Sequence, residues 1–266
     1  MATDQDRFDI VIIGSGIGGY PAAIRAAQLG ARVAVIEKQY VGGTCLNVGC
    51  IPSKAFLHIG HLFAETKEFG SFGIELHAAP TFNMPAAVAF KDKVVKQLTG
   101  GVGQLLKANG ITLIEGTAEA LSPTQVRVAL KAGGTRELTA GKLILANGSV
   151  PIAPPFPGID GRNVIYSDDV MTMQSVPESV VCIGGGIIAV ELACFFNAIG
   201  TKVTIVEMLP AIIANEDEEV RNLLARSFQR RGIEIHTNAK VESIADAGKL
   251  KRVTAQTPEG AKTYDG

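Results

Sequence analysis

Cys45 and Cys50 are the residues whose type and spacing point most directly to chemistry. They lie in the run Gly-Gly-Thr-Cys-Leu-Asn-Val-Gly-Cys-Ile-Pro-Ser-Lys, residues 42–54, where two thiols can close into a small disulfide ring. The glycines of the run leave the backbone free to bend around that ring. Because the run follows a phosphate-binding signature, the pair indicates redox chemistry rather than a purely structural disulfide. Two inert core thiols and a zinc site are the alternatives, although neither the spacing nor a second ligand pair favours zinc.

A glycine-rich turn precedes the dithiol run. Residues 8–13 predict a strand, residues 20–29 an alanine-rich helix, and residues 33–36 a second strand that ends at Glu37. The turn after the first strand holds Gly14, Gly16, Gly18 and Gly19. Such glycines permit a tight turn and let the backbone approach a pyrophosphate, which the helix N-terminus attracts. Glu37 stands where a carboxylate can accept hydrogen bonds from ribose hydroxyls. The pattern predicts a dinucleotide site.

The same unit returns 170 residues later. Residues 180–183 and 203–206 predict two strands, residues 190–199 the helix between them, and Glu207 is the acid. The second turn holds Gly184, Gly186, Ile187 and Ile188, and Ala189 replaces the last glycine. One glycine signature is weak evidence, but two copies in the same frame and with the same spacing are strong. Glycine-rich turns without a ligand are the alternative.

Two dinucleotide sites suggest two dinucleotides. The dithiol follows the first copy, which favours FAD there and the nicotinamide cofactor in the second copy. A carboxylate at Glu207 accepts from a free 2′-hydroxyl but would repel a 2′-phosphate. Met208 and Leu209, not arginine, follow it, so NAD is favoured over NADP.

The elements between these motifs predict an α/β fold, with two Rossmann-like dinucleotide-binding domains built on parallel sheets and a small antiparallel β-meander. Prolines at residues 151–157 mark the boundary between an FAD-binding domain with the redox disulfide, residues 1–150, and an NAD-binding domain, residues 151–266. Further helices are expected at residues 55–69, 85–109 with an interruption at Gly100-Gly101, and 217–231. Further strands are expected at residues 111–115, 125–130, 136–139, 143–146, 233–237, 240–244 and 253–257.

The composition excludes several functions. The chain has 266 residues, 47% of them hydrophobic, and a formal net charge of −1, so it can build a core and carries no basic footprint for nucleic acid. No apolar run approaches the roughly 18 residues of a membrane span, and residues 1–9 do not resemble a secretory signal. Four cysteines are too few for a disulfide scaffold, which favours the cytoplasm. Cys182 and Cys194 are expected to be small core residues.

The sequence resembles the dihydrolipoamide dehydrogenases, a family of flavoprotein disulfide oxidoreductases, over essentially its whole length. The resemblance is carried by the dithiol run at residues 42–54 and by Lys-Asp-Lys-Val-Val-Lys-Gln-Leu-Thr-Gly-Gly-Val at residues 91–102. Gly-Ile-Glu at residues 232–234, which leads into Lys240 and Val241, also fits.

The resemblance implies a reaction and the roles of single residues. Such enzymes reoxidise protein-bound dihydrolipoamide and reduce NAD through FAD. By resemblance, Cys45 exchanges with the substrate sulfur, Cys50 lies next to the flavin, and Lys54 pairs with Glu191 near the flavin. Further cofactor contacts implied in the same way are Lys38, Gly43, Thr44, Lys54 and Gly148.

The resemblance also implies partners and a location. The partners would be the lipoyl domains of 2-oxo acid dehydrogenase or glycine cleavage complexes, and the full-length enzyme would be a homodimer. It would lie in the cytoplasm, or in the mitochondrial matrix of a eukaryote after removal of a transit peptide.

Several features depart from the family pattern. Asn147 stands where the family has threonine, and the segment from Ile187 to Glu191 is nearer to glutathione reductases. Family members continue with a flavin-binding Gly-Asp segment and a dimerisation domain that carries a His-Glu acid–base pair. The family's His-Pro context is found at none of His58, His61, His77 and His236. We therefore expect a truncated chain, with an incomplete NAD-binding domain and little steady-state turnover. The alternatives are another disulfide or mercuric reductase of the superfamily, and a catalytically incomplete nucleotide-binding fragment.

Overall fold

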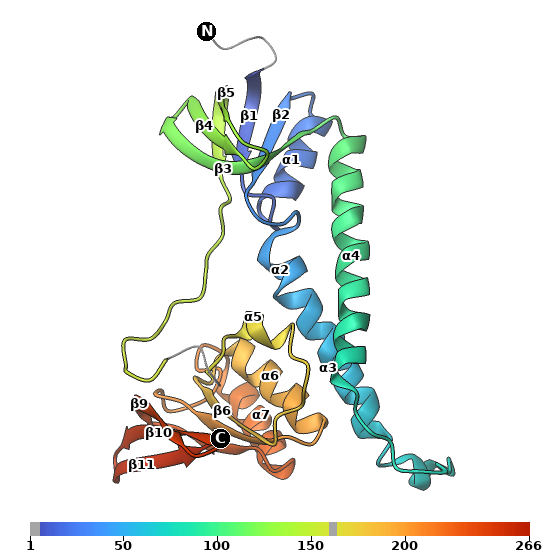
Figure 1. The fold of residues 1–266 in the computed structure, drawn as a ribbon, viewed down its shortest axis with the longest axis vertical. Helices are drawn as coiled ribbons and strands as arrows, with labels where there is room; N and C mark the ends of the chain where they lie inside the picture. The colour runs from blue at the N-terminus through green and yellow to red at the C-terminus, as the bar shows by residue number, and fades with distance from the viewer. Residues whose placement is uncertain (1–5, 160–163) are drawn as a thin grey trace. The chain divides into compact units, whose positions relative to one another are not determined.

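The structure is a computed structural model that describes residues 6–159 and 164–266. Residues 1–5 of the predicted first domain and residues 160–163 of the predicted second domain lie outside the described part. The chain forms two compact units, drawn in Figure 1. The first consists of Met1–Pro52 and Asp92–Val150, and the second of Ser53–Lys91 and Pro151–Gly266. That residues 1–150 bind FAD and residues 151–266 bind NAD stays a prediction.

Within its described residues, the first unit contains five strands that pair in a closed ring. They are β1 (Arg7–Ile13), β2 (Val33–Glu37), β3 (Thr112–Ser122), β4 (Gln125–Leu130) and β5 (Thr135–Leu145). β1 lies between β2 and β5 and pairs with both in parallel, and β2 pairs in parallel with β3. Valine and isoleucine dominate β1 and β2, as is typical of parallel strands buried on both faces. The predicted helix α1 (Gly19–Gln28) connects β1 to β2 and lies beside them in Figure 1.

β5 is one strand where the sequence predicted two. The expected gap between residues 139 and 143 is wrong because β5 changes its partner there rather than ending. Its first half pairs antiparallel with β4, and its second half pairs in parallel with β1. Gly141 stands near this exchange, where a Cβ atom would lie 2.8 Å from the carbonyl oxygen of Asp9 in β1. β5 therefore brings the antiparallel strands back to the strand that opens the unit.

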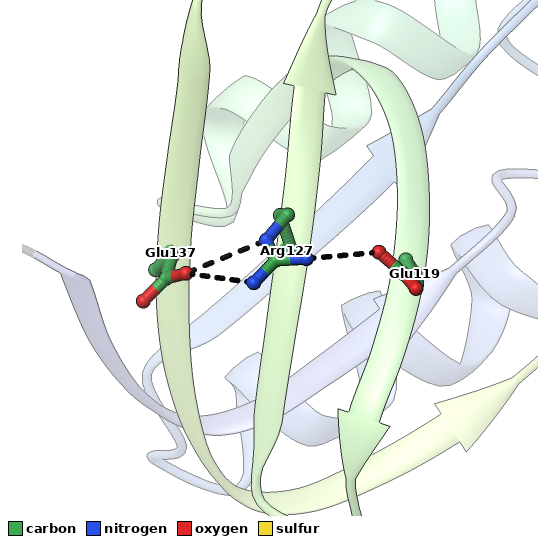
Figure 2. A network of polar contacts seen from close by, with 3 residues as sticks. All are labelled: Glu119, Arg127 and Glu137. Carbon is green, nitrogen blue, oxygen red and sulfur yellow. Dashed lines mark hydrogen bonds and ion pairs between the residues drawn. The ribbon is translucent and has the colours of Figure 1, made fainter.

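The antiparallel strands of the first unit present charged side chains on one face. Arg127 on β4 lies opposite Glu119 on β3 and Glu137 on β5, and Figure 2 shows its guanidinium group between the two carboxylates. The shortest nitrogen–oxygen distances of these ion pairs are 3.3 Å to Glu119 and 3.4 Å to Glu137. The neighbouring positions point to the opposite, buried face, which includes Val126, Val128 and Leu138. This alternation fixes which face of the strands meets solvent.

Helices occupy more of the chain than the sequence predicted. α2 (Gly43–Asn47) and the start of α3 (Cys50–Glu65) cover the dithiol run, and a short 3-10 helix, η2 (Phe69–Phe72), follows. α4 (Met84–Ala108) is continuous through Gly100 and Gly101, so the predicted interruption is wrong. A glycine in a helix costs only about 1 kcal/mol relative to alanine. Burial of Val102 and Leu106 in a core outweighs that cost.

The second unit has a parallel sheet in the order β6 (Ser179–Ile183), β7 (Lys202–Val206), β8 (Glu234–His236). α6 (Ile187–Ala198) joins β6 to β7, and α7 (Glu218–Arg230) joins β7 to β8. α7 begins at the N-cap Asp217 with two glutamates in its first turn, which suits the positive end of the helix dipole. The one-turn helix α5 (Ser167–Val170) was not predicted. In the core, Phe56 of α3 stacks on Phe195 of α6 with ring centroids 5.0 Å apart.

A separate antiparallel sheet completes the second unit. It consists of β9 (Lys240–Ala247), β10 (Leu250–Thr257) and β11 (Gly260–Asp265), with β10 in the middle. β11 was not predicted, because Tyr264 is its one buried side chain. Parallel sheets with crossover helices and an antiparallel meander confirm the predicted α/β fold class. In the described part of the chain, no helix is both long and apolar enough to cross a membrane.

Candidate functional site

The first glycine turn begins directly at the end of β1. The N–H of Gly14 donates to the carbonyl of Ile36 on β2, at 2.8 Å. Gly14 has a φ of +100°, and a Cβ atom on it would lie 2.2 Å from the carbonyl oxygen of Ala146. Only glycine therefore fits at this position. Of the other predicted residues of this turn, Gly16 and Gly18 precede α1, and Gly19 is its first residue.

The helix that follows the turn is prepared for a negative ligand. No side chain caps the N-terminus of α1, and its first turn holds no acidic residue. The second copy is similar, because α6 has Gly186 as its N-cap, no side-chain cap and no acidic residue in its first turn. By contrast, α7 carries two glutamates in its first turn. An unopposed helix dipole and N–H groups without a side-chain cap favour a phosphate, which fits the start of α6. In α1 the N–H groups of Gly19 and Tyr20 donate to the carbonyl of Gly16, so the helix dipole and the backbone of the turn itself are what suit a pyrophosphate there.

Glu37 ends β2 and faces back toward the glycine turn. Its Oε2 accepts from the N–H of Ser15 at 2.9 Å, and its Oε1 accepts from the N–H of Gln39 at 2.8 Å. Burial alone would raise the pKa of this carboxyl. Hydrogen bonds from the backbone of Gln39, Ser15 and Lys38 and from the Ser15 side chain outweigh burial and lower the pKa below its ordinary value. Glu37 is therefore held as a carboxylate next to the turn. The side chain of Lys38, a predicted cofactor contact, is exposed.

The dithiol run forms a disulfide at a break between two helices. Cys45 lies in α2 and Cys50 is the first residue of α3; the two are joined by a disulfide with their Cα atoms 4.6 Å apart. Cys45 is half-buried and Cys50 is exposed. Asn47 holds α2 in place, since its Nδ2 donates to the carbonyls of Val41 and Gly43, each at 2.9 Å. Thr44, a predicted cofactor contact, is exposed on α2.

Gly43 brings the disulfide and the first glycine turn together. A Cβ atom on Gly43, which has a φ of +66°, would lie 2.5 Å from the Cα of Gly16. The N–H of Gly42 also donates to the carbonyl of Ser15 at 3.1 Å. The start of α2 is therefore packed backbone to backbone on the first turn, which places the disulfide helix beside a predicted phosphate site. Gly148, the last predicted residue of this unit, follows β5, is exposed and has a φ of +69°.

The second glycine turn repeats this geometry. The N–H of Gly184 donates to the carbonyl of Val206 on β7 at 2.8 Å, as Gly14 does to Ile36. Glu207 accepts from the N–H of Gly185 and from the N–H of Leu209. A cavity of about 1280 Å³ in the second unit is lined by this turn, and its lining includes Gly184, Gly186, Ile187, Ile188 and Glu207. Its size and its polar turn suit a nucleotide.

The structure also forms the ion pair that the family resemblance implied. Nζ of Lys54 on α3 contacts Oε1 of Glu191 on α6, and both residues belong to the second unit. Lys54 is exposed, whereas Glu191 is mostly covered. That this pair lies near a flavin stays a prediction.

The other two cysteines have different surroundings. Cys182 lies in β6, and burial raises the pKa of its thiol to about 11, which makes it a poor nucleophile. Cys194 lies half-buried in α6, where Nη1 of Arg231 donates to its sulfur at 3.2 Å. Across residues 6–159 and 164–266, no group of three or more histidine, cysteine, aspartate or glutamate side chains could hold a metal ion.

The sequence did not single out Ser15 and Asn47, the polar side chains that position the first turn and the disulfide helix. Ser15 is fully buried, and a polar residue between two glycines of a turn was the signal that could have revealed it. The side chain of Asn47 donates to backbone carbonyls four and six residues earlier in the chain, and the residue pattern alone did not show these bonds.

Comparison with known proteins adds a family to this geometry. Residues 8–265 match the model of the pyridine nucleotide-disulphide oxidoreductases. A dihydrolipoyl dehydrogenase of Acholeplasma laidlawii is 41% identical over 244 residues, which is 90% of this chain and 71% of that protein. Mitochondrial dihydrolipoyl dehydrogenase 1 of Arabidopsis thaliana is 36% identical over 98% of this chain and 52% of its own length. Several other relatives are likewise covered over about half of their length.

A solved structure shares the fold. The HOCl-induced flavoprotein disulfide reductase RclA of Escherichia coli, solved as a Cu(II) complex, superposes with a TM-score of 0.80 at 29% identity. The match covers 97% of this chain and 54% of that one. The likeness therefore extends over nearly all of this chain and about half of the longer protein.

Proposed function

Because the chain belongs to the pyridine nucleotide-disulphide oxidoreductase family, we propose that it carries the dithiol and dinucleotide sites of a dihydrolipoyl dehydrogenase. In the reaction, a dihydrolipoyl dithiol and NAD⁺ give a lipoyl disulfide, NADH and a proton. The observation that carries the proposal is the Cys45–Cys50 disulfide, packed through Gly43 onto a glycine turn. A disulfide with a purely structural role would not need to lie against a phosphate-binding turn.

The two glycine turns would bind the two cofactors of the family, which uses FAD and NAD(H). In the first unit, Gly14, Gly16 and the positive N-terminal end of α1 would hold the pyrophosphate of FAD, and Glu37 would accept from a ribose hydroxyl. FAD, when bound, supplies the two-electron relay between the dithiol and the nicotinamide. In the second unit, the turn at Gly184 and the acid Glu207 would hold NAD in the cavity that they line. The carboxylate of Glu207 would repel the 2′-phosphate of NADP.

The chain's own thiols would carry out the exchange with substrate. A thiolate of dihydrolipoamide attacks the sulfur of Cys45, the Cys45–Cys50 bond breaks, and Cys50 leaves as a thiolate. The second substrate thiol then attacks the mixed disulfide, which releases lipoamide and leaves Cys45 reduced. The protein disulfide is thus reduced to two thiols, while the two thiols of the substrate are oxidised to a disulfide. The ion pair of Lys54 and Glu191 would set the local charge near the flavin.

The partners and the location are proposed by analogy with the relatives. We propose that protein-bound lipoyl groups of 2-oxo acid dehydrogenase or glycine cleavage complexes are the substrates, and that the full-length enzyme is a homodimer. Relatives come from bacteria and from mitochondria, which suits the cytoplasm or the mitochondrial matrix.

Counting thiols tests the proposed exchange. The chain has four cysteines, so denatured protein should show two thiols before and four after incubation with dihydrolipoamide. Adding FAD and NAD⁺ should then remove two thiols and form one NADH per chain, whereas NADP⁺ should react much more slowly. Cys45→Ser and Cys50→Ser should each abolish the increase of two thiols on incubation with dihydrolipoamide. The control Cys194→Ser should still show that increase.

Two results would contradict the proposal. One is a disulfide that dihydrolipoamide leaves intact under native conditions. The other is a reduced dithiol that FAD and NAD⁺ together fail to reoxidise, which would favour a nucleotide-binding protein without this activity.

A further inference from the structure

The two copies of the glycine turn hold their acids differently. Ser15 and Gly185 are the equivalent middle residues of the two turns, each 22 residues before its acid. In both copies the backbone N–H of the middle residue donates to Oε2 of the acid. Only the first copy has a side chain at this position. The comparison therefore isolates what that side chain adds.

Ser15 adds a second hydrogen bond to the same carboxylate oxygen. Its Oγ donates to Oε2 of Glu37 at 2.7 Å, beside the backbone bond of 2.9 Å. With the N–H of Gln39 on Oε1, at least three donors hold Glu37, whereas within the described residues two N–H groups donate to Glu207. Ser15 is fully buried and Glu37 is 9% exposed, so water does not compete strongly for these bonds. Hydrogen bonds to a carboxylate in such a site are stronger than neutral ones.

The second copy has no room for the same device. A Cβ atom on Gly185 would lie 2.8 Å from Cγ2 of Ile212 and 3.2 Å from both Cβ and Oε2 of Glu207. A serine at this position would have to displace Ile212, which is 2% exposed in the core of the second unit. The difference between the turns is therefore built into the packing of each unit.

We propose that Ser15 is a positioning residue of the first dinucleotide site, where its hydroxyl locks the Glu37 carboxylate to the glycine turn so that this site retains its dinucleotide more tightly than the second. The inference rests on the proposed function, in which the first site keeps FAD and the second exchanges NAD. Because the carboxylate is already fixed, no conformational entropy of the Glu37 side chain is lost when the ribose binds to it, which strengthens binding.

The test compares Ser15→Ala with the matched control Ser122→Ala, a half-buried serine at the end of β3 in the same unit. Dissociation constants for FAD and NAD⁺ are measured on the full 266-residue chain by fluorescence titration. Loss of a hydrogen bond to a charged group should weaken FAD binding by about tenfold or more. NAD⁺ binding should stay unchanged, and Ser122→Ala should change neither constant.

Two further measurements separate positioning from a general effect on folding. In the cofactor-free protein, the pKa of the Glu37 carboxyl, followed by carbon-13 NMR, should rise in Ser15→Ala. In a Glu37→Gln background, Ser15→Ala should no longer weaken FAD binding, because the serine acts through this carboxylate. If Ser15→Ala does not fold, Ser15→Gly replaces it, since glycine occupies the equivalent position of the second copy.

The outcomes distinguish this inference from the proposed function. If wild-type protein binds FAD and the serine variant has the same FAD affinity and the same Glu37 titration, Ser15 has no positioning role while the proposed function stands. If wild-type protein does not bind FAD, the proposed function fails, and this inference fails with it. An equal loss in the Glu37→Gln background would also overturn the inference, because the serine would then act by another route.

Discussion

The two copies of the strand–turn–helix–strand unit have the same local geometry and different surroundings. Gly14 and Gly184 make the same 2.8 Å backbone bond to the second strand and have the same φ of +100°. The difference lies on the other side of the opening strand. β1 pairs with both β2 and β5, whereas β6, in the described part of the chain, pairs with β7 alone. In the first unit, the antiparallel strands belong to the same sheet as β1, because β5 pairs with it. In the second unit, the antiparallel strands form a separate sheet.

This difference shows what the pairing of β5 with β1 does for the first unit. Val11, in the middle of β1, is completely buried, but its counterpart Val181 in β6 is half-buried. Ala146, just after β5, also covers Gly14, whereas no atom lies within 4 Å of a Cβ atom placed on Gly184. The same local sequence thus has a stricter structural requirement where a third strand covers it.

The largest difference between the copies is expected for their first glycines. Gly14→Ala should lower the free energy of unfolding by about 4 kcal/mol or more, because the new methyl group would overlap the Ala146 carbonyl in addition to the φ strain. Gly184→Ala has the strain alone and should cost about 1–3 kcal/mol. Urea unfolding followed by circular dichroism measures both.

A helical glycine serves as the control for this pair. Gly101 lies within α4 with no atom near its Cβ position, so Gly101→Ala should stabilise the protein by about 0.5–1 kcal/mol. Equal costs for Gly14→Ala and Gly184→Ala would show that the strand β5 imposes no extra constraint on the first turn.

A smaller difference is expected for two equivalent valines. Val11→Ala removes two fully buried methyl groups from β1 and should cost about 2–3 kcal/mol. Val181→Ala removes the same groups from a half-buried position and should cost about 1 kcal/mol. The measurement is the shift of the urea midpoint at constant slope. If Val181→Ala were as costly as Val11→Ala, the pairing of β5 would not be what buries the opening strand.

The sequence predicted the elements around each glycine turn because their apolar runs are short, separated by glycine and repeated at a fixed offset. It failed where a tertiary contact decides the outcome. A gap was expected between residues 139 and 143, and a glycine in the middle of a strand usually weakens it. β5 nevertheless continues through Gly141 because it passes there from β4 to β1. Gly100 and Gly101 suggested an interruption that the packing of α4 overrides.

The candidate site shows the same limit. Cys45 and Cys50 are close in sequence, so their disulfide could be predicted from spacing. The ion pair between Lys54 and Glu191 joins residues 137 positions apart, and only the family resemblance suggested it. The bond from Ser15 to Glu37 was not predicted at all, because nothing in a turn sequence shows which way a buried hydroxyl points.

The smallest effects are expected on the exposed antiparallel strands of the two units. Arg127 shares its charge between Glu119 and Glu137 through long bonds of 3.3–3.4 Å, so Arg127→Ala should cost less than about 0.5 kcal/mol. Arg252 makes two 2.7 Å bonds to Asp265 across β10 and β11, and this forked geometry is the arrangement in which a surface pair contributes most. Arg252→Ala should therefore lower the melting temperature more than Arg127→Ala, and a high salt concentration should narrow the gap because it screens both pairs. A larger effect of Arg127→Ala would mean that a shared charge across three strands stabilises a sheet better than a single well-formed fork.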